Sequence, residues 1–305
     1  MKYIAGKTDF YINNSAVTLG KFDGLHLGHQ MLINEVLSLK KQGLTSVMFT
    51  FMYHPHNVIS DNEIKLIYTE EEKKIKLSES GLDILISYHF TYQTKNIEPE
   101  DFVKDILVEK LDAKVIVVGS DFRFGRERRG DVEMLKAMED IYGFKVMAFE
   151  KKTWNNKVIS SSAIRSELEQ GNMEAVNAML GHPYSIYGKV LHGRKIGRTL
   201  GMPTTNLIPS ANKLLPPRGV YVSRTIADGK SYPGMTNIGF KPTVGNEDHI
   251  SIETYIYDFD KDLYGRDILV ELLAFERPEI KFDSIDELKR RMVEDLAFGR
   301  KFFGI

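Results

Sequence analysis

The sequence predicts two domains, an α/β domain with a mostly parallel sheet over residues 1–182 and a small antiparallel β-barrel with a C-terminal helix over residues 183–305. At 305 residues and 42% hydrophobic composition, the chain is long enough for two ordinary cores. Short apolar runs alternate with amphipathic segments in the first half of the chain, which is typical of a parallel sheet covered by helices. From residue 184 onward, glycine and proline become dense between short alternating runs, which indicates antiparallel strands.

In the first domain, four apolar runs are the expected strands. They cover residues 17–19, 47–51, 84–86 and 115–118. Between the first two, apolar residues recur at helical spacing over residues 31–39, and Gly43 stands where a helix C-cap is expected. This order is a strand, turn, helix, strand unit.

In the second domain, alternating runs at residues 251–257 and 268–275 indicate strands of the barrel. Ser284 and Glu287 form a capping-box pattern, which predicts the start of a helix. The apolar residues that follow at helical spacing are Ile285, Leu288, Met292 and Leu296. We therefore expect a closing amphipathic helix that covers the barrel.

Composition argues against several classes of protein. The 41 Lys and Arg residues balance 42 Asp and Glu residues, so a net charge of −1 predicts no general attraction to nucleic acid or to an anionic membrane. The absence of cysteine excludes disulfides, thiolate zinc sites and a cysteine nucleophile. Polar residues interrupt residues 1–10, and no later run is long enough to span a membrane. We therefore expect a soluble cytoplasmic protein.

A glycine-rich turn with two histidines follows the first expected strand. Its sequence, residues 20–29, is GKFDGLHLGH. Glycines let the backbone approach a ligand, and the N–H groups at a helix start bind phosphate. His26 and His29 are three residues apart, so both imidazoles are expected beside that phosphate, where donors stabilise the transition state of adenylyl transfer. The alternative is a glycine-rich turn with two solvated histidines.

The pattern Gly-x-Phe-Asp-Gly-x-His-x-Gly-His resembles the signature of the bacterial FAD synthetase module, a Rossmann-like nucleotidyltransferase. The resemblance continues through residues 50–55, 119–125 and 159–165, and it implies that His26 and His29 are catalytic. The nucleotide contacts that it implies are Gly20, Phe22, Asp23, Gly24, Gly28, His54, Ser161, Ser162 and Arg165. The flavin contacts that it implies are Asp121, Phe122 and Phe124. For the two phenylalanines, the alternative is a place in the core.

A second glycine-rich segment, GKVLHGRKIGRTLGMPTTN, occupies residues 188–206. Glycines recur every four residues from Gly193 to Gly201, and such a loop can wrap phosphates with its N–H groups. The residues expected at the nucleotide are Gly193, Gly197, Arg198 and Gly201. Thr204 and Asn206 then offer the oxygen ligands that Mg²⁺ prefers. We therefore expect this segment to bind ATP with magnesium. The alternative is that it is only a flexible surface loop.

This segment resembles the riboflavin kinase signature, whose Pro-Thr-Ala-Asn element is here residues 203–206, PTTN. The resemblance continues in family order to the C-terminus and implies that Glu253 is the catalytic base. Glu253 alternates with Ile252 and Thr254 in an expected strand, so its side chain lies on the opposite face from theirs. A cross-strand ion pair is the alternative role of this carboxylate.

Together the two resemblances imply a bifunctional enzyme that uses ATP twice. Riboflavin and ATP would give FMN and ADP in the second domain, and FMN and ATP would give FAD and pyrophosphate in the first, both with Mg²⁺. The expected partners are these small molecules, with no nucleic acid and no membrane. The sequence leaves the oligomeric state open.

Three alternatives stay open. Tyr53 stands where the family usually has proline, and Ala163 where arginine is common, so the chain could be a riboflavin kinase with an impaired adenylyltransferase domain. A second alternative is a non-catalytic flavin or nucleotide sensor. The third is an RNA-binding protein that uses the arginines of residues 123–129, against which the balanced charge argues.

Overall fold

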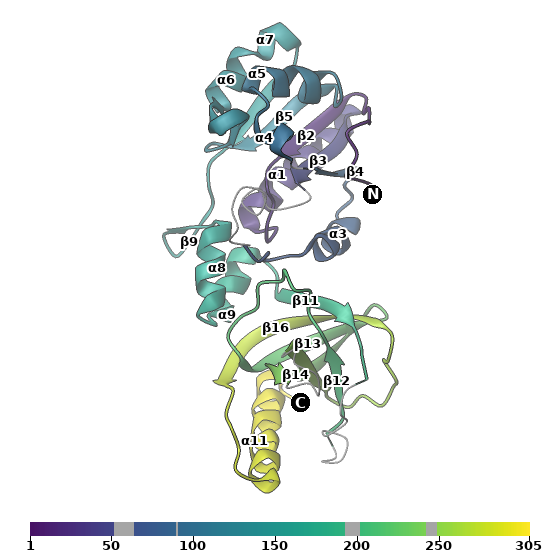
Figure 1. Cartoon of the computed structure of the whole chain (residues 1–305), viewed down its shortest axis with the longest axis vertical. Helices are drawn as coiled ribbons and strands as arrows, with labels where there is room; N and C mark the ends of the chain where they lie inside the picture. The colour runs from purple at the N-terminus through teal and green to yellow at the C-terminus, as the bar shows by residue number, and fades with distance from the viewer. Residues whose placement is uncertain (52–63, 90, 193–201, 242–248) are drawn as a thin grey trace. The chain divides into compact units, whose positions relative to one another are not determined.

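The computed structural model describes residues 1–51, 64–89, 91–192, 202–241 and 249–305. Contacts between residues divide the chain into two compact units, Met1–Ser161 and Ser162–Ile305. Each unit has a six-stranded sheet of its own, parallel in the first and antiparallel in the second (Figure 1). The predicted fold class of both halves is confirmed.

The sheet of the first unit has the strand order β1-β4-β3-β2-β5-β8, and all neighbouring strands are parallel. Its strands are β1 (Lys2–Ala5), β2 (Ser15–Leu19), β3 (Thr45–Phe51), β4 (Ile84–Tyr88), β5 (Ala113–Gly119) and β8 (Lys145–Phe149). The four predicted strands are the central ones, β2 to β5. Central strands read as apolar runs because both of their faces are buried, whereas the edge strands β1 and β8 begin with exposed Lys2 and Lys145.

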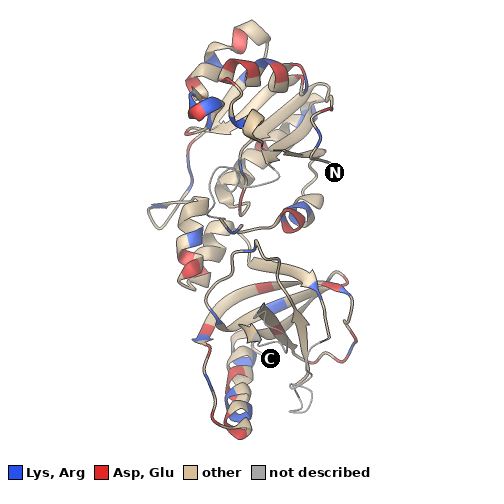
Figure 2. Cartoon of the chain, viewed as in Figure 1, with Lys and Arg blue, Asp and Glu red and all other residues tan. Residues whose placement is uncertain are grey.

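Alternate residues of the central strands enter two separate cores. Val47 and Phe49 of β3 belong to one buried cluster, and Met48 between them belongs to the other. Since successive side chains of a strand point to opposite faces, both faces of the sheet are covered. In Figure 2 the strands of this sheet are mostly tan, and the charged residues are concentrated on the helices.

The turn after β2 leads into α1 (Leu27–Ser38), which continues as the 3-10 helix η1 (Leu39–Gln42). Gly43 ends this helix with φ at 80°, which confirms the predicted C-cap. In the described part of this unit, the further helices are α3 (Glu70–Ser78), α4 (Tyr92–Lys95), α5 (Pro99–Asp101), the π-helix η2 (Phe102–Val108), the 3-10 helix η3 (Arg126–Arg128), α6 (Val132–Ala137) and α7 (Glu139–Tyr142). Two short strand pairs complete it: β6 (Arg123–Phe124) with β7 (Gly130–Asp131), and β9 (Thr153–Trp154) with β10 (Lys157–Val158).

The antiparallel sheet of the second unit is curled into a half-barrel with the strand order β11-β16-β13-β14-β15-β12. Its strands are β11 (Tyr184–Lys189), β12 (Thr204–Leu207), β13 (Gly219–Ala227), β14 (Lys230–Lys241), β15 (His249–Ile256) and β16 (Asp267–Pro278). The edges of the sheet approach each other, because Leu191, just after β11, donates its N–H to the carbonyl of Asn206 in β12 at 2.7 Å.

Two helices precede this sheet. α8 (Ser161–Glu169) begins at the division between the units, and α9 (Met173–Leu180) packs on β16 and β11. Asn177 ties α9 to the backbones of these two strands through hydrogen bonds of 3.0 and 2.7 Å. Residues 162–182 thus make their contacts with the second unit, and the domain boundary after residue 182 stays a prediction.

The last helix, α11 (Ile285–Phe303), confirms the predicted closing helix. Ser284 caps its start by accepting the N–H of Glu287 at 3.1 Å. The Glu287 carboxylate accepts the N–H of Asp283 at 3.2 Å, so the reciprocal bond of the expected capping box is shifted by one residue. Ile285 is 70% exposed, and it is therefore not part of the apolar face.

Three contacts hold α11 on the sheet. The Tyr257 hydroxyl donates to the Leu296 carbonyl at 2.6 Å. Buried Arg277 forms a two-pronged ion pair with buried Asp295, at 2.8 and 2.6 Å. Gly299 faces the sheet, where a Cβ would collide with Tyr257. Within the described ranges, no helix combines the length and the hydrophobicity needed to cross a bilayer.

Candidate active sites

The two histidines of the glycine-rich turn stack at the start of α1. His26 is the N-cap residue, and its Nδ1 accepts the N–H of His29 at 3.3 Å. The imidazole centroids lie 3.6 Å apart, with 17° between the ring planes. The structure therefore brings together the two residues that the sequence predicts to act as a pair.

The glycines of this turn allow close packing around the histidines. Gly24 has φ at 89°, in the left-handed region that favours glycine. A Cβ on Gly28 would lie 3.2 Å from the ring of His26, and a Cβ on Gly20 would lie 3.1 Å from the ring of Phe22. Phe22 is buried, and its ring centroid lies 5.0 Å from that of the second histidine.

Both histidines are neutral at neutral pH. Burial lowers the pKa of His26 to about 4. Burial, followed by the charges of His26 and Lys73, holds the pKa of His29 well below its ordinary value of 6.5. Because Nδ1 of neutral His26 accepts a hydrogen bond, its proton is on Nε2. His26 thus offers a neutral N–H donor at a helix start, which suits a phosphate oxygen.

Asp23 clamps the turn to two other segments. Its carboxylate accepts the N–H groups of Ile67 and Tyr68 at 3.0 and 3.3 Å. Its backbone carbonyl accepts the hydroxyl of Ser161, the last residue of the first unit, at 2.9 Å. Asp23 is 4% exposed, and these contacts fix the conformation of the turn.

The predicted flavin contacts lie in different environments. Phe124 is 7% exposed and belongs to the core of the first unit. Phe122 stacks on it at a centroid distance of 5.6 Å and is partly exposed. Asp121 is exposed and forms an ion pair with Lys151 at 2.6 Å. Of the three, Asp121 and Phe122 are therefore accessible to a ligand.

The other predicted nucleotide contacts lie either in the second unit or outside the described residues. Ser162 and Arg165 lie in α8 and, by their contacts, in the second unit, as does Ala163. The residues His54, Gly193, Gly197, Arg198 and Gly201 lie outside the described residues, as does Tyr53.

In the second unit, three polar residues form a row across neighbouring strands. Glu253 on β15 is the register partner of Asn206 on β12 and of Asn237 on β14. Directly opposed residues of adjacent strands share a face of the sheet. On the other face Ile252 and Thr254 are buried, whereas Glu253 is partly exposed. Its side chain is therefore on the face that the alternation predicts.

Glu253 lines a cavity of about 320 Å³ between the sheet and α11, which we call the helix-side cavity. Polar Asn237 and aromatic Tyr255 flank it on the sheet. The helix contributes the apolar side chains Leu288, Met292 and Leu296. The apolar face of α11 thus faces a cavity as well as the core. The wall on α11 is mostly apolar, with Asp295 as its one charged residue, and the wall on the sheet carries the polar side chains of Glu253 and Asn237.

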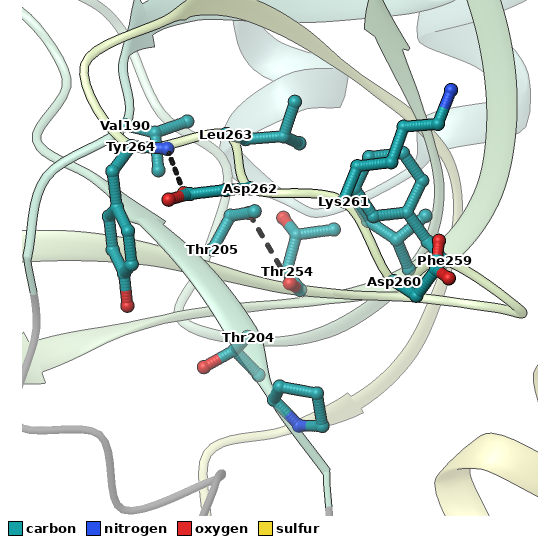
Figure 3. Close-up of a pocket in the computed structure, with 12 residues that line it drawn as sticks. Val190, Thr204, Thr205, Thr254, Phe259, Asp260, Lys261, Asp262, Leu263 and Tyr264 are labelled. Carbon is teal, nitrogen blue, oxygen red and sulfur yellow. Dashed lines mark hydrogen bonds between the residues drawn. The ribbon is translucent and has the colours of Figure 1, made fainter.

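A second cavity, of about 280 Å³, lies beside β12 and is lined by residues 259–264, and we call it the loop-side cavity (Figure 3). The Asp262 carboxylate accepts the N–H of Tyr264 at 2.8 Å, and the Tyr264 ring stacks on His192 at a centroid distance of 3.9 Å. Thr204 lines both cavities. The two cavities therefore share a wall residue that carries a hydroxyl.

The described side chains fit magnesium that is carried by a nucleotide. Among them, no group of three or more histidine or carboxylate side chains could hold a metal ion. Mg²⁺ usually keeps several waters and takes only one or two protein oxygens together with phosphate oxygens. Thr204, which lines both cavities, and buried Asn206 carry such oxygens on the strand beside Glu253.

Known proteins resemble this chain along nearly its full length. Residues 10–163 match the family model described as FAD synthetase, and residues 180–303 match the one described as riboflavin kinase. The bifunctional riboflavin kinase/FMN adenylyltransferase of Listeria monocytogenes is 35% identical over 95% of this chain and 93% of its own. The protein of the same name from Escherichia coli K12 is 35% identical over the same shares. The chain belongs to this family.

A solved structure extends the likeness to the fold. The crystal structure of a protein from Streptococcus pneumoniae, named a macrolide-efflux protein, matches with a TM-score of 0.87 at 29% identity and covers 98% of this chain and 99% of that chain. Within the bifunctional family, the FAD synthetase region of this chain contains the histidine pair. The riboflavin kinase region contains Glu253 and both cavities.

Two polar residues lie near predicted site residues although the sequence predicts no site role for them. Asn237 joins the row of Glu253 only through strand register, which the alternation within one strand cannot reveal. Lys73 reaches the surroundings of His29 from α3, although it belongs to the polar run EEEKK, which is typical of a solvated helix. No local signal could have separated Lys73 from its neighbours.

Proposed function

We propose that the chain phosphorylates riboflavin to FMN at Glu253 and adenylylates FMN to FAD at His26 and His29. The observation that carries the proposal is the position of Glu253, which opens into the helix-side cavity while Thr204 beside it lines both cavities. A planar flavin suits the apolar wall formed by α11, and a polyhydroxyl chain suits the polar wall.

In the kinase step, the terminal hydroxyl of the ribityl chain attacks the γ-phosphorus of ATP, and the bond from that phosphorus to the ADP oxygen breaks. Glu253 accepts the proton of the hydroxyl as general base. The amides of Asn206 and Asn237 flank the carboxylate and orient it or the ribityl chain. ATP then occupies the loop-side cavity with its γ-phosphate toward Thr204.

Magnesium would be held by Thr204 and Asn206 together with the phosphates. When bound, Mg²⁺ neutralises charge on the transferring phosphoryl group. A hydroxyl and an amide oxygen are acceptable ligands for this hard cation, and both residues lie in β12 next to the proposed base.

In the adenylylation step, a phosphate oxygen of FMN attacks the α-phosphorus of ATP, and pyrophosphate leaves. His26 and His29, together with the N–H groups at the start of α1, donate to the oxygens of the α-phosphate as charge develops on them. Asp121 and Phe122 are the accessible flavin-side residues of this unit. The reaction needs no protein nucleophile.

The test is to incubate the pure protein with riboflavin and Mg-ATP and to separate the flavins by chromatography over time. We expect FMN first and FAD after a lag, because FMN is the substrate of the second step. If the protein makes FMN from riboflavin but no FAD, even when FMN is supplied, its adenylyltransferase is impaired. No product at all would mean a non-catalytic flavin or nucleotide binder.

A further inference from the structure

Lys73 is a buried lysine whose donors the described residues only partly use. The described residues include two buried lysines, Lys73 and Lys213. The ammonium group of Lys213 donates to the Ser185 carbonyl at 2.7 Å and lies 4.3 Å from the ring centroid of Tyr184, so its burial is compensated. Among the described residues, the ammonium group of Lys73 makes one polar contact, with Glu70 at 3.4 Å. This is long for a charge-assisted hydrogen bond, and an ammonium group has three donors.

Glu70 is anchored at the parallel sheet. Its second carboxylate oxygen accepts the hydroxyl of Tyr3 at 3.0 Å and the hydroxyl of Ser87. Ser87 lies near the carboxyl end of β4, and the ligands of open parallel sheets bind outside the carboxyl ends of the strands. Glu70 therefore holds Lys73 at the edge of the sheet where a nucleotide would bind.

The helix that carries Lys73 is clamped to the histidine turn. Asp23 of that turn binds the N–H groups of Ile67 and Tyr68, just before the N-cap of α3. The Lys73 charge lies close enough to His29 to lower the pKa of that imidazole. The Nδ1 atom of His29 is buried and has no hydrogen-bond partner among the residues that the structure describes. Lys73 and the Nδ1 atom of His29 are thus two buried polar groups whose hydrogen-bonding capacity the described residues do not fill.

We propose that Lys73 binds the pyrophosphate portion of ATP in the adenylylation site, a role that rests on the proposed function. Buried charges are costly unless they are paired, and a phosphate oxygen would supply the acceptor that Glu70 alone does not. Lys73 contributes a fixed positive charge beside two neutral histidines. The pyrophosphate portion is negatively charged in ATP and after it has left, and a nearby cation binds it in both states.

The test compares Lys73→Met with Lys74→Met. Lys74 is the next residue, but its side chain is 42% exposed and pairs with Glu71, so it is a matched control. In Lys73→Met we expect the KM for ATP in FAD formation from supplied FMN to rise about tenfold to a hundredfold, the usual effect of a lost charge-assisted hydrogen bond. The KM for pyrophosphate in the reverse reaction, from FAD to FMN and ATP, should rise by a similar factor. Lys74→Met should leave both constants unchanged.

Denaturant unfolding followed through Trp154, which lies in the first unit as Lys73 does, reports on the integrity of each variant. Lys73→Arg keeps the charge and should retain most of the pyrophosphate affinity, and it serves as the second variant if Lys73→Met does not fold. Unchanged KM values in folded Lys73→Met, with or without a lower kcat, would overturn the proposal. A loss of pyrophosphate affinity in folded Lys73→Arg as large as that in Lys73→Met would also overturn it. A wild-type protein that makes no FAD would instead refute the proposed function.

Discussion

The chemistry assigned to this chain depends on two kinds of side chain whose state is set by their neighbours. His26 is kept neutral by burial and is oriented by the hydrogen bond from the His29 backbone. Glu253 stays accessible because its face of the strand opens into the helix-side cavity. One substitution can test whether burial lowers the pKa of His26. Another can test whether Glu253 is the general base.

The histidine pair should make the first unit less stable in mild acid. In the unfolded chain His26 becomes protonated as the pH falls below 6.5. In the folded chain it stays neutral until the pH approaches its pKa of about 4. The free energy of unfolding should therefore be highest above pH 6.5 and decrease as the pH falls from 6.5 to about 4. The total decrease due to His26 should be about 3 kcal/mol. Unfolding by denaturant, followed through the single tryptophan, Trp154, measures this loss. A decline of equal size in His26→Gln would show that His26 is not its source.

Glu253→Gln separates a general base from a structural ion pair. The amide keeps the size of the side chain but cannot accept the ribityl proton, so FMN formation should fall by roughly a hundredfold to ten-thousandfold. FAD formation from supplied FMN should not change. The control is Glu271→Gln on β16, which removes a carboxylate paired with Arg224 at 3.2 Å and should leave both rates unchanged. Near-normal FMN turnover in folded Glu253→Gln would remove Glu253 as the base.

At the scale of elements, α11 acts as the apolar wall of the helix-side cavity. It approaches the sheet at Gly299, where even a Cβ would collide with Tyr257 and Met235. The ion pair between Arg277 and Asp295 and the bond from Tyr257 hold the helix at this distance. The width of the cavity therefore depends on how closely the helix packs.

Gly299→Ala should move α11 outward. We expect a loss of about 1–3 kcal/mol of unfolding free energy from overpacking, partly offset by the higher helix propensity of alanine. Because Met235 and Leu296 line the cavity, the KM for riboflavin should rise as well. Thermal unfolding and the kinase assay measure both effects, with Val293→Ala as control because Val293 is 52% exposed on the same helix. An unchanged melting temperature and KM would show that the helix does not define the pocket.

At the scale of the whole molecule, the two activities belong to two units with separate cores. The FAD synthetase match ends at residue 163 and the riboflavin kinase match begins at residue 180. The segment between them contains α9, whose buried side chains pack on the second sheet. Where the second unit begins therefore matters for its stability.

We predict that a fragment of residues 162–305 is more stable than one of residues 183–305. The shorter fragment loses α9 and the apolar contacts of Val176, Met179 and Leu180, each of which contributes about 1.5–3 kcal/mol when fully buried. Its melting temperature, measured by circular dichroism, should be lower by about 10 °C or more. Both fragments should make FMN, since Glu253 and the cavities lie beyond residue 183. Equal melting temperatures would support the boundary after residue 182.

The sequence by itself determines the elements and the chemical groups that they carry. Apolar runs predict the four central strands of the first sheet because those strands are buried on both faces. The glycine-rich turn and its histidine spacing predict two imidazoles on one side of a helix start, and the structure shows them stacked at the start of α1. The alternation of β15 predicts the face of Glu253, because side-chain direction follows from local geometry alone.

Only the tertiary structure decides which groups from distant segments meet. Asn206 and Asn237 flank Glu253 through the pairing of three strands, and α11 adds the apolar wall of its cavity. Lys73 reaches the surroundings of His29, although it stands in a run of charges that reads as solvated. Such contacts depend on strand register and on packing between residues far apart in the chain, and local periodicity carries no record of either.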